Sequence, residues 1–505
     1  MSLQVADAPE RTSLLRFRTK GHLGQQYPLV GCPFLAYATS PLGDARAIEI
    51  FSAPITCSRL SWAYSPGWMR DIVLLVSVAI SRVTLTSRES SYRKRVVDRE
   101  LEDLLSAVGA VVIEGPRACG KTATARQVAA SEVLLDVDLD ARRAVQIDPR
   151  LVLEGPTPRL IDEWQTEPAT WNHIRRSVDD RGTPGQFILT GSAVPADDVT
   201  RHTGAGRISR LRMRTMSLYE TGHSNGAISL ERLFGAGDPS CPDPGLSLLD
   251  LAERTAVGGW PGLLGRGTAE SLRAIRGYLD EIRRLDITRM ERTRRDPEKV
   301  GRLLRSLARN VSTYAAATTL ARDAGGPEGA LDDDTVREYL GVLERLMVVE
   351  DQPAWSPPLR SRSVLRSGPK RHFVDPSLAA ASLRATPERL LADLNLFGLL
   401  FESLVVRDLR VYSQAMDARV MQYRDSTGLE VDIIIEVADG RWGAFEVKLG
   451  SGLIDEGAAG LLKFRSRIDS SRCGDPAVLG VIVGTGYGYR RPDGVAVVPV
   501  GALKP

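Results

Sequence analysis

The chain has 505 residues, of which 43% are hydrophobic and 26% are charged, a composition that is ordinary for soluble globular proteins. This length is too great for a single hydrophobic core, so we expect about three domains. Basic and acidic residues nearly balance at 66 and 63, and the net charge of +3 excludes a global field that would draw the whole molecule to nucleic acid.

Cysteine usage and the apolar runs predict a cytoplasmic protein. The five cysteines are dispersed and include no C-x-x-C pair, which argues against a disulfide framework or a structural zinc site. The longest apolar run, Asp71–Ser81, is too short to span a bilayer and lies too deep in the chain for a signal peptide. We expect no stable membrane insertion. A buried segment, a non-native tail and a peripheral anchor are the interpretations left open for this run.

Residues 1–90 differ from the rest of the chain. They show no sustained helical or strand period, because Gly, Pro, Ser and Thr interrupt every apolar group. We expect a poorly ordered extension that results from a start site placed too early, with an authentic N-terminal module as the alternative. The pattern becomes regular from about residue 91.

Residues 91–225 alternate short apolar strands with helices. The strands are predicted in "AVVIEG", "PRLIDEW" and "GQFILTGS", and helices such as "TATARQVAA" lie between them. This alternation predicts an α/β fold in which helices cover both faces of a parallel sheet.

The segment "GPRACGKT" matches the phosphate-binding pattern G-x-x-x-x-G-K-[ST], between a predicted strand and a predicted helix. Main-chain N–H groups of such a P-loop surround the β-phosphate of a bound nucleotide. Lys121 is expected to bridge the β- and γ-phosphates, and the Thr122 hydroxyl to bind Mg²⁺. The predicted ATP-binding residues are Gly115, Pro116, Arg117, Ala118, Cys119, Gly120, Lys121 and Thr122.

Further candidates for nucleotide chemistry follow the P-loop. Asp162 is predicted to hold the hydrated Mg²⁺ and Glu163 to polarise the attacking water. Ser192, after the third strand, is the candidate γ-phosphate sensor, with Thr190 as the second choice. Arg207 is the candidate arginine finger, acting from another subunit or after a domain closure. Neighbouring arginines leave this last choice open: Arg201, Arg210, Arg212 and Arg214.

Residues 226–385 are mostly helical in pattern. Three helix-like segments are followed by an extended stretch, a basic loop and a second extended piece, which is the order of a winged helix. The basic loop, Arg360–Arg371, is suited to contacts with a DNA backbone, although a solvated loop is the plainer interpretation. Its cations are Arg360, Arg362, Arg366, Lys370 and Arg371.

Residues 386–505 begin with a helix and continue with five predicted strands. Short motifs accompany the P-loop along the chain, among them "LIDEWQ", "ILTGS", "MSLYE", "GGWPGLL", "PKRHFVDPSLAAASL" and "EVDIII…FEVKLG". With these motifs the chain from Tyr92 onward resembles the bacterial and archaeal AAA-type ATPases that carry a C-terminal domain known as DUF4143. The resemblance implies an ATPase core, a winged-helix-like middle region and a C-terminal α+β domain similar to the PD-(D/E)xK, or restriction-endonuclease-like, nucleases.

Such nucleases place an Asp on one strand and E-x-K on the next. By this resemblance, Asp432 and Glu446 would hold Mg²⁺, Lys448 would orient or deprotonate a water, and Glu402 on the preceding helix would supply a further acid. Residues i and i+2 of a strand share a face, so Glu446 and Lys448 point the same way. The same pattern also fits a half-buried antiparallel pair whose charges face water.

Two functions therefore compete. The first is a Mg²⁺-dependent ATPase coupled to a nuclease-like domain that engages nucleic acid. The second is a nucleotide-gated switch that binds a protein partner through a nuclease-like domain without catalytic activity.

Overall fold

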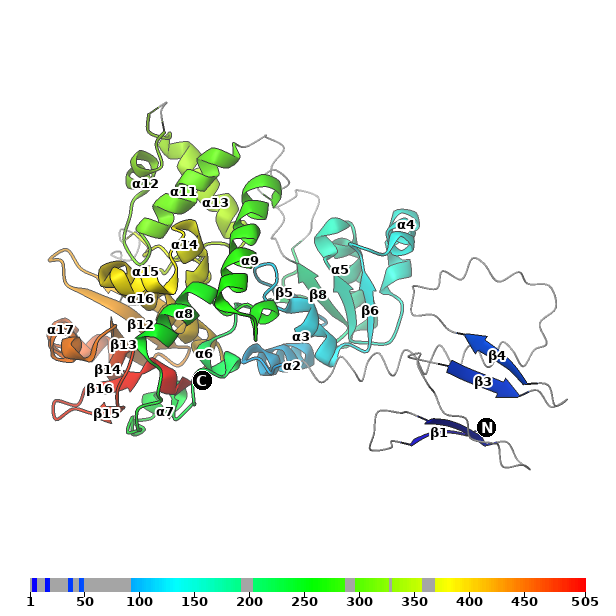
Figure 1. The fold of residues 1–505 in the computed structure, drawn as a ribbon, viewed down its shortest axis with the longest axis horizontal. Helices are drawn as coiled ribbons and strands as arrows, with labels where there is room; N and C mark the ends of the chain where they lie inside the picture. The colour runs from blue at the N-terminus through cyan, green and yellow to red at the C-terminus, as the bar shows by residue number, and fades with distance from the viewer. Residues whose placement is uncertain are drawn as a thin grey trace. The chain divides into compact units, whose positions relative to one another are not determined.

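The computed structural model describes residues 92–191, 203–286, 296–326, 329–356 and 368–505, together with the backbone of four short strands near the N-terminus (Figure 1). The chain divides into two units, Met1–Ser90 and Ser91–Pro505. In the first unit, β1 (Ser2–Ala6) pairs antiparallel with β2 (Leu14–Arg18), and β3 (Leu35–Thr39) with β4 (Ala45–Glu49). The rest of the predicted extension lies outside the described residues.

Removal of residues 1–88 is expected to leave a stable protein that still binds ATP. The second unit begins at Ser91 and contains the hydrophobic clusters of the described chain. Thermal unfolding of the truncated protein, with and without Mg-ATP, checks this expectation. Aggregation of the truncation would show that the N-terminal unit is part of the fold.

The first part of the second unit is built on a five-stranded, all-parallel sheet in the order β6-β7-β8-β5-β9. The strands are β5 (Ala110–Glu114), β6 (Ser131–Leu134), β7 (Arg159–Asp162), β8 (Phe187–Gly191) and β9 (Ile208–Arg212). The helices are α2 (Val97–Ala107), α3 (Lys121–Val128), α4 (Leu139–Ile147) and α5 (Thr170–Arg181), with the 3-10 turns η2 (Pro149–Leu153) and η3 (Trp164–Thr166).

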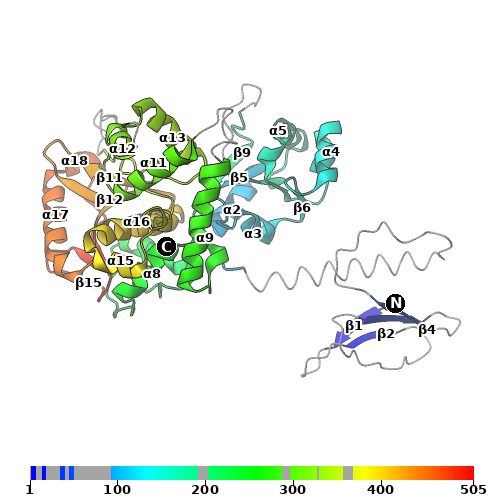
Figure 2. The same cartoon turned by 45° about the horizontal axis from the view of Figure 1, so that its top comes forward.

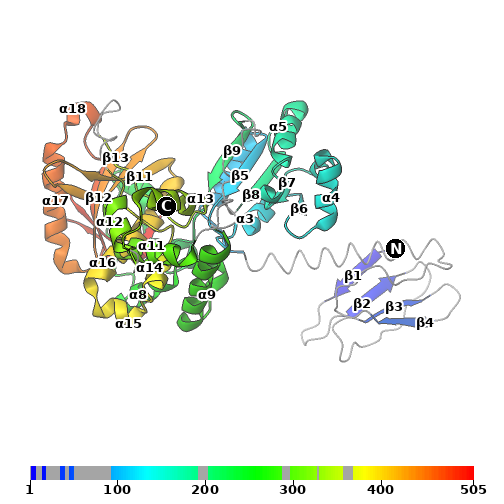
Figure 3. The same cartoon turned by 90° about the horizontal axis from the view of Figure 1, so that it is seen from above.

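Helices cover both faces of this sheet, as the sequence predicts. On one face, Val111 and Ile113 of β5 join a cluster with Leu101 of α2 and Ala125 of α3. The opposite face packs against α4 and α5. Its strand contacts come from Ala110, Val112, Ile161, Phe187 and Leu189. Alternate residues of β5 therefore enter two separate cores, which is why the strand reads as a continuous apolar run. Figure 3 shows the strands of this sheet together with α3, α4 and α5.

The middle region is helical, as predicted. It contains α6 (Leu218–Thr221), β10 (Ile228–Ser229), α7 (Leu230–Phe234), α8 (Leu248–Val257), η4 (Pro261–Leu263), α9 (Thr268–Glu281), the π-helical turn η5 (Ile282–Asp286), α11 (Pro297–Arg309), α12 (Ala317–Asp323), α13 (Asp333–Arg345), α14 (Pro376–Ser382) and α15 (Pro387–Ala392). After α13, two antiparallel bridges join Val349 to Phe373 and Gln352 to Lys370. Three helices followed by an antiparallel pair is the order expected of a winged helix.

The C-terminal part has a mixed six-stranded sheet in the order β11-β12-β13-β14-β16-β15. The strands are β11 (Ala418–Arg424), β12 (Glu430–Val437), β13 (Trp442–Lys448), β14 (Val478–Val483), β15 (Tyr489–Arg490) and β16 (Ala496–Pro499). The other elements are α16 (Leu394–Gln414), η7 (Ser451–Leu453), α17 (Ile454–Arg467), α18 (Ser470–Cys473), η8 (Val500–Ala502) and β17 (Leu503–Lys504). α16 and α17 lie on opposite sides of the strands (Figure 2). This arrangement confirms the predicted mixed α+β class.

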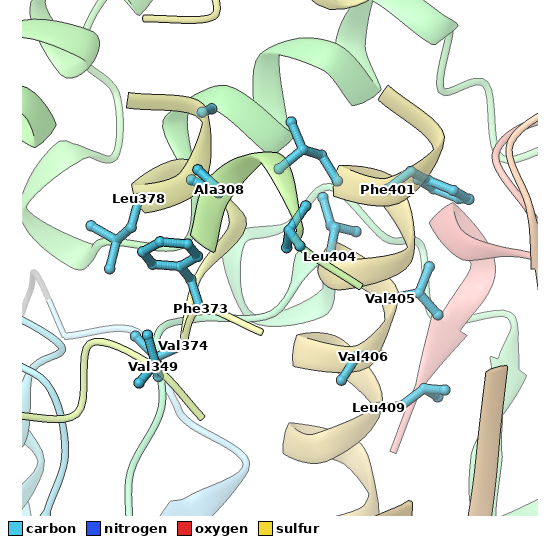
Figure 4. Packing of buried hydrophobic residues seen from close by; sticks show 14 of the residues in the cluster. Ala308, Val349, Phe373, Val374, Leu378, Phe401, Leu404, Val405, Val406 and Leu409 are labelled. Carbon is cyan, nitrogen blue, oxygen red and sulfur yellow. The ribbon is translucent and has the colours of Figure 1, made fainter. Parts of the chain in front are cut away.

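One large hydrophobic core joins the middle helices to α16. Phe373, Val374 and Leu378 pack in the same cluster as Leu404 and Val405 of α16 (Figure 4). The last strand of the chain, β17, pairs parallel with β10 of the middle region. No helix within the described residues is long and apolar enough to cross a membrane.

Candidate functional site

The P-loop connects the end of β5 to the start of α3. Gly120, immediately before α3, has φ +105°, and Ala118 has φ +60°, so the chain turns through left-handed conformations there. A side chain at Gly115 would begin 2.3 Å from the carbonyl oxygen of Met213. The first glycine of the motif is therefore required by close packing against the segment that follows β9. Cys119 is completely buried, as expected of a small filler residue.

Lys121 lies folded back over the loop. Its ammonium donates to the carbonyl oxygens of Gly115 and Pro116, each at 2.9 Å, and the residue is buried. These carbonyl oxygens carry only partial negative charge, so they attract the ammonium less strongly than the full negative charges of phosphate oxygens would. The Lys121 ammonium is thus held beside the P-loop by two carbonyl oxygens, which the oxygens of a triphosphate could replace.

Asp162 joins the P-loop helix to the neighbouring strands. Its Oδ1 accepts a hydrogen bond from the Thr122 hydroxyl at 2.8 Å and another from the Thr190 hydroxyl. β8 lies between β7 and β5, so Thr190, the second choice for the γ-phosphate sensor, donates to the same carboxylate oxygen as Thr122. A hydroxyl and a carboxylate are oxygen donors of the kind that Mg²⁺ prefers, so this donor set fits the ion.

Glu163 follows Asp162 in a strained backbone conformation. Its φ is +51°, in the left-handed region that a glutamate rarely adopts. The carboxylate accepts a hydrogen bond from the Gln165 side chain. Ser312 and Met347, away from the P-loop, share this conformation, so the role predicted for Glu163 stays a prediction.

The predicted arginine finger lies away from the phosphate end of the sheet. The Arg207 carbonyl accepts from Ala110 at the start of β5, whereas the P-loop follows the end of that five-residue strand, about 16 Å further on. The Arg207 guanidinium pairs with Asp179 at 2.8 Å. Arg207 is therefore remote from the P-loop of its own chain in this structure, and its role as an arginine finger stays a prediction. Ser192 and Arg201 lie outside the described residues.

The other arginines of this region have structural partners. Arg210 pairs with Glu114, and Arg214 pairs with Glu350 at 2.6 Å. Burial lowers the pKa of Arg212. None of these contacts distinguishes one of the three as a finger.

Arg95 contacts the P-loop directly, although the sequence did not predict a role for it. Its guanidinium donates to the carbonyl oxygen of Cys119 at 2.9 Å, pairs with Glu220 at 3.0 Å and donates to the carbonyl of Arg214 at 2.8 Å. The available signal was an arginine in the motif "YRKRVVDRELEDLL". Its partner in "MSLYE" lies 125 residues away.

The C-terminal candidates converge in one place. Asp432 on β12 accepts from the Val447 N–H at 3.0 Å, and Lys448 pairs with Glu446 at 3.2 Å on β13. Glu402 of α16 reaches the same cluster, because Lys370 contacts it at 2.5 Å and also contacts Asp432 at 3.1 Å. Among the described residues, no group of three or more His, Cys, Asp or Glu side chains is arranged to hold a metal ion.

The electrostatics of this cluster reflect its burial. Burial raises the pKa of Glu446 to about 8, and the charge of Asp432 adds to the effect while Lys448 opposes it. Burial alone would lower the pKa of Lys370, but the carboxylates of Glu402 and Asp432 outweigh it and hold that pKa above its usual value. The lysine is accordingly an ammonium among carboxylates.

The basic loop differs from the expectation at its described end. Lys370, predicted to contact DNA phosphates, is only 3% exposed and lies in the carboxylate cluster. Arg371 pairs with Asp351. Both cations are thus neutralised internally. Arg360, Arg362 and Arg366 lie outside the described residues.

A buried junction links the end of the sheet domain to α14 and α16. Arg407 lies between Asp408, at 2.6 Å, and Asp375, at 3.1 Å, and all three side chains are at most 2% exposed. Asp375 also accepts from the Thr215 hydroxyl at 2.7 Å and the Gly259 N–H at 3.0 Å. A side chain at Gly259 would begin 1.9 Å from the Met216 carbonyl oxygen, which explains the paired glycines of "GGWPGLL".

Comparisons with known proteins match three consecutive parts of the chain. Residues 108–222 match the model of an AAA domain, residues 248–389 match the domain of unknown function DUF8612, and residues 397–503 match the domain of unknown function DUF4143. A search of curated proteins found no match.

Among solved structures, the chain is similar to a signal transduction ATPase with numerous domains and a tetratricopeptide repeat sensor from Pyrococcus horikoshii. The identity is 13%, the match covers 65% of this chain and 54% of that one, and the TM-score of 0.18 is too low to support an argument. The family models carry the assignment: the chain combines an AAA domain of the P-loop type with a C-terminal DUF4143 domain.

Proposed function

We propose that the protein binds and hydrolyses Mg-ATP at the P-loop and passes its nucleotide state to the C-terminal domain. The observation that carries the proposal is the hydrogen bond from Thr122 to Asp162, which brings together the two oxygen donors expected at a nucleotide-bound Mg²⁺. Bound Mg²⁺ would neutralise charge on the phosphates. The dispersed free thiols favour a cytoplasmic setting.

Each residue of the site has a separate task. Main-chain N–H groups from Gly115 to Thr122 would surround the phosphates, and Lys121 would exchange its two carbonyl partners for phosphate oxygens. Thr122 and Asp162 would hold the ion. Glu163 would orient the attacking water and accept its proton, and the hydrogen bond from Gln165 would help to position its carboxylate.

The nucleotide is proposed to lie beside the helical region. Pro261 approaches the P-loop so closely that a side chain on Gly120 would begin 3.6 Å from its Cγ. A cavity of about 320 Å³ adjoins this segment and is lined by Arg93, Trp260 and Leu263, among others. A nucleotide that contacts both the P-loop and the helical region would bind one arrangement of these two parts better than another. This difference in affinity is what a nucleotide-driven switch requires.

Substitution Glu163→Gln is expected to leave ATP binding intact and to stop turnover. The amide keeps the shape and the hydrogen-bonding capacity toward Gln165 but cannot accept the proton of the attacking water. Nucleotide affinity and phosphate release measured on the same preparation check this prediction. The matched control is Glu102→Gln on the exposed face of α2, which should turn over normally. Hydrolysis at the wild-type rate by the Glu163 variant would show that the role is misassigned.

A continuous set of contacts supports coupling to the C-terminal domain. Arg95 touches the P-loop at Cys119 and pairs with Glu220. Two residues before Glu220, the Leu218 N–H donates to Asp408 of α16 at 3.0 Å. A change in the P-loop that moves Arg95 would therefore reach α16, which carries Glu402, through three direct interactions.

A second candidate function is metal-dependent cleavage of nucleic acid by the C-terminal domain. The convergence of Asp432, Glu446 and Lys448 favours it. The two candidates differ in a plasmid-nicking assay with Mg²⁺. Nicking that disappears in Asp432→Ala while ATP hydrolysis persists would support the nuclease. Intact plasmid together with ATP-dependent capture of a protein partner would support the switch.

A further inference from the structure

The ammonium of Lys370 lies between Asp432, a metal ligand in the nuclease interpretation, and Glu402, the further acid of that interpretation. It is 2.5 Å from Glu402 Oε1 and 3.1 Å from Asp432 Oδ1, and its side chain is 4% exposed. These carboxylates come from α16 and β12, so the lysine joins two elements that would otherwise bring like charges together. Without the lysine, two buried acids would lie together with no cation to compensate their charge, which is costly in a medium of low polarity.

The backbone fixes the position of this lysine. Lys370 and Gln352 exchange main-chain hydrogen bonds at 3.0 and 2.9 Å, and the Gln352 side chain donates to the carbonyl oxygens of Met421 and Asp432. The ammonium also lies 5.8 Å from the centroid of the Tyr314 ring. Lys370 is therefore held by an antiparallel bridge and by packing, whereas a surface lysine reaches its partner through a flexible stem.

Both oxygens of Asp432 and one oxygen of Glu446 already have hydrogen-bond or ion-pair partners. Asp432 uses Oδ1 for Lys370 and Oδ2 for the Val447 N–H. Glu446 uses Oε2 for Lys448, whose ammonium also lies 3.6 Å from Glu456. Three acidic side chains thus face two lysines, and burial raises the pKa of both Glu402 and Glu446 to about 8. A divalent ion here would displace hydrogen bonds and lie close to a fixed positive charge in a medium of low polarity, where repulsion is strong.

We propose that Lys370 is the resident cation of the C-terminal carboxylate cluster and that it excludes a divalent metal from the position between Glu402 and Asp432. The cluster is then a charge-compensated joint between the segment 368–373, α16 and β12. The C-terminal domain engages its partner without metal chemistry. This inference does not rest on nucleotide binding, because the cluster shares no residue with the P-loop.

Mn²⁺ binding to the full-length protein without nucleotide tests the proposal. Electron paramagnetic resonance of free Mn²⁺ gives the binding curve directly, without any assay of activity. The wild-type protein and Asp432→Asn should give the same curve. Lys370→Met, which keeps an apolar stem of similar length but removes the charge, should gain one Mn²⁺ per chain with at least about tenfold higher affinity than any wild-type site. Adding Asp432→Asn to this variant should abolish the gain.

Two results would overturn the proposal. One is wild-type Mn²⁺ binding that Asp432→Asn removes, and the other is a folded Lys370→Met protein that gains no Mn²⁺. If Lys370→Met does not fold, the comparison of wild type with Asp432→Asn still decides, because exclusion is a property of the wild-type protein. Loss of ATP turnover in Glu163→Gln is measured separately, so failure at one site is distinguishable from failure at the other.

Discussion

Lys121→Ala is expected to lose ATP binding almost completely. The ammonium would make at least two charge-assisted hydrogen bonds to phosphate oxygens, and hydrogen bonds to charged groups contribute about 1.5–3 kcal/mol each. Their loss corresponds to about 3 kcal/mol or more, about a hundredfold or more in Kd. The carbonyls of Gly115 and Pro116, which now accept from Lys121, would turn to water.

Equilibrium dialysis with radiolabelled ATP in the presence of Mg²⁺ measures this loss. Lys463→Ala on the exposed face of α17 is the matched control, since it removes the same ammonium from a position far along the chain. The control should bind as the wild type does. An affinity within about threefold of wild type for Lys121→Ala would contradict the assignment of this lysine to the phosphates.

Arg407→Met is expected to be the most destabilising single substitution discussed here. It would leave Asp375 and Asp408, both at most 1% exposed, without their shared cation. Removing one partner of a buried ion pair costs about 3–5 kcal/mol, because the remaining charge stays buried and uncompensated. The methionine replaces much of the apolar stem, so the loss reports mainly on charge.

The midpoint of urea unfolding gives the effect of this substitution. Arg407→Lys should lose less, because it keeps the charge while giving up part of the guanidinium contact to the two carboxylates. The control is Arg143→Met, whose exposed pair with Asp140 should contribute nothing measurable. A midpoint for Arg407→Met equal to that of the control would show that the junction does not stabilise the fold.

The nucleotide-binding part of the fold was predictable because its signals are local. The P-loop residues are contiguous, and the strands on either side of it are apolar runs that enter two cores. Strands β6 and β9 escaped prediction. β6 has the sequence "SEVL" and buries only its valine, so it gives no continuous apolar run, and the arginines in "ISRLR" make β9 resemble a basic segment.

The contacts that sequence reasoning missed join distant parts of the chain. Lys370 meets Glu402 and Asp432 at separations of 32 and 62 residues, and Arg95 meets Glu220 across 125 residues. From the sequence alone, Lys370 cannot be distinguished from the other basic residues of the loop Arg360–Arg371. The convergence of Asp432, Glu446 and Lys448 was predicted from a family resemblance. That resemblance indicated which residues of the two strands lie side by side, which composition and spacing alone do not indicate.

The most direct test of the central claim is isothermal titration calorimetry of Mg-ATP into the folded full-length protein. Saturable binding with one nucleotide per chain, lost in Lys121→Ala, is the predicted result. An absence of heat across several temperatures, with the protein shown to be folded, would contradict nucleotide binding and with it the proposed switch.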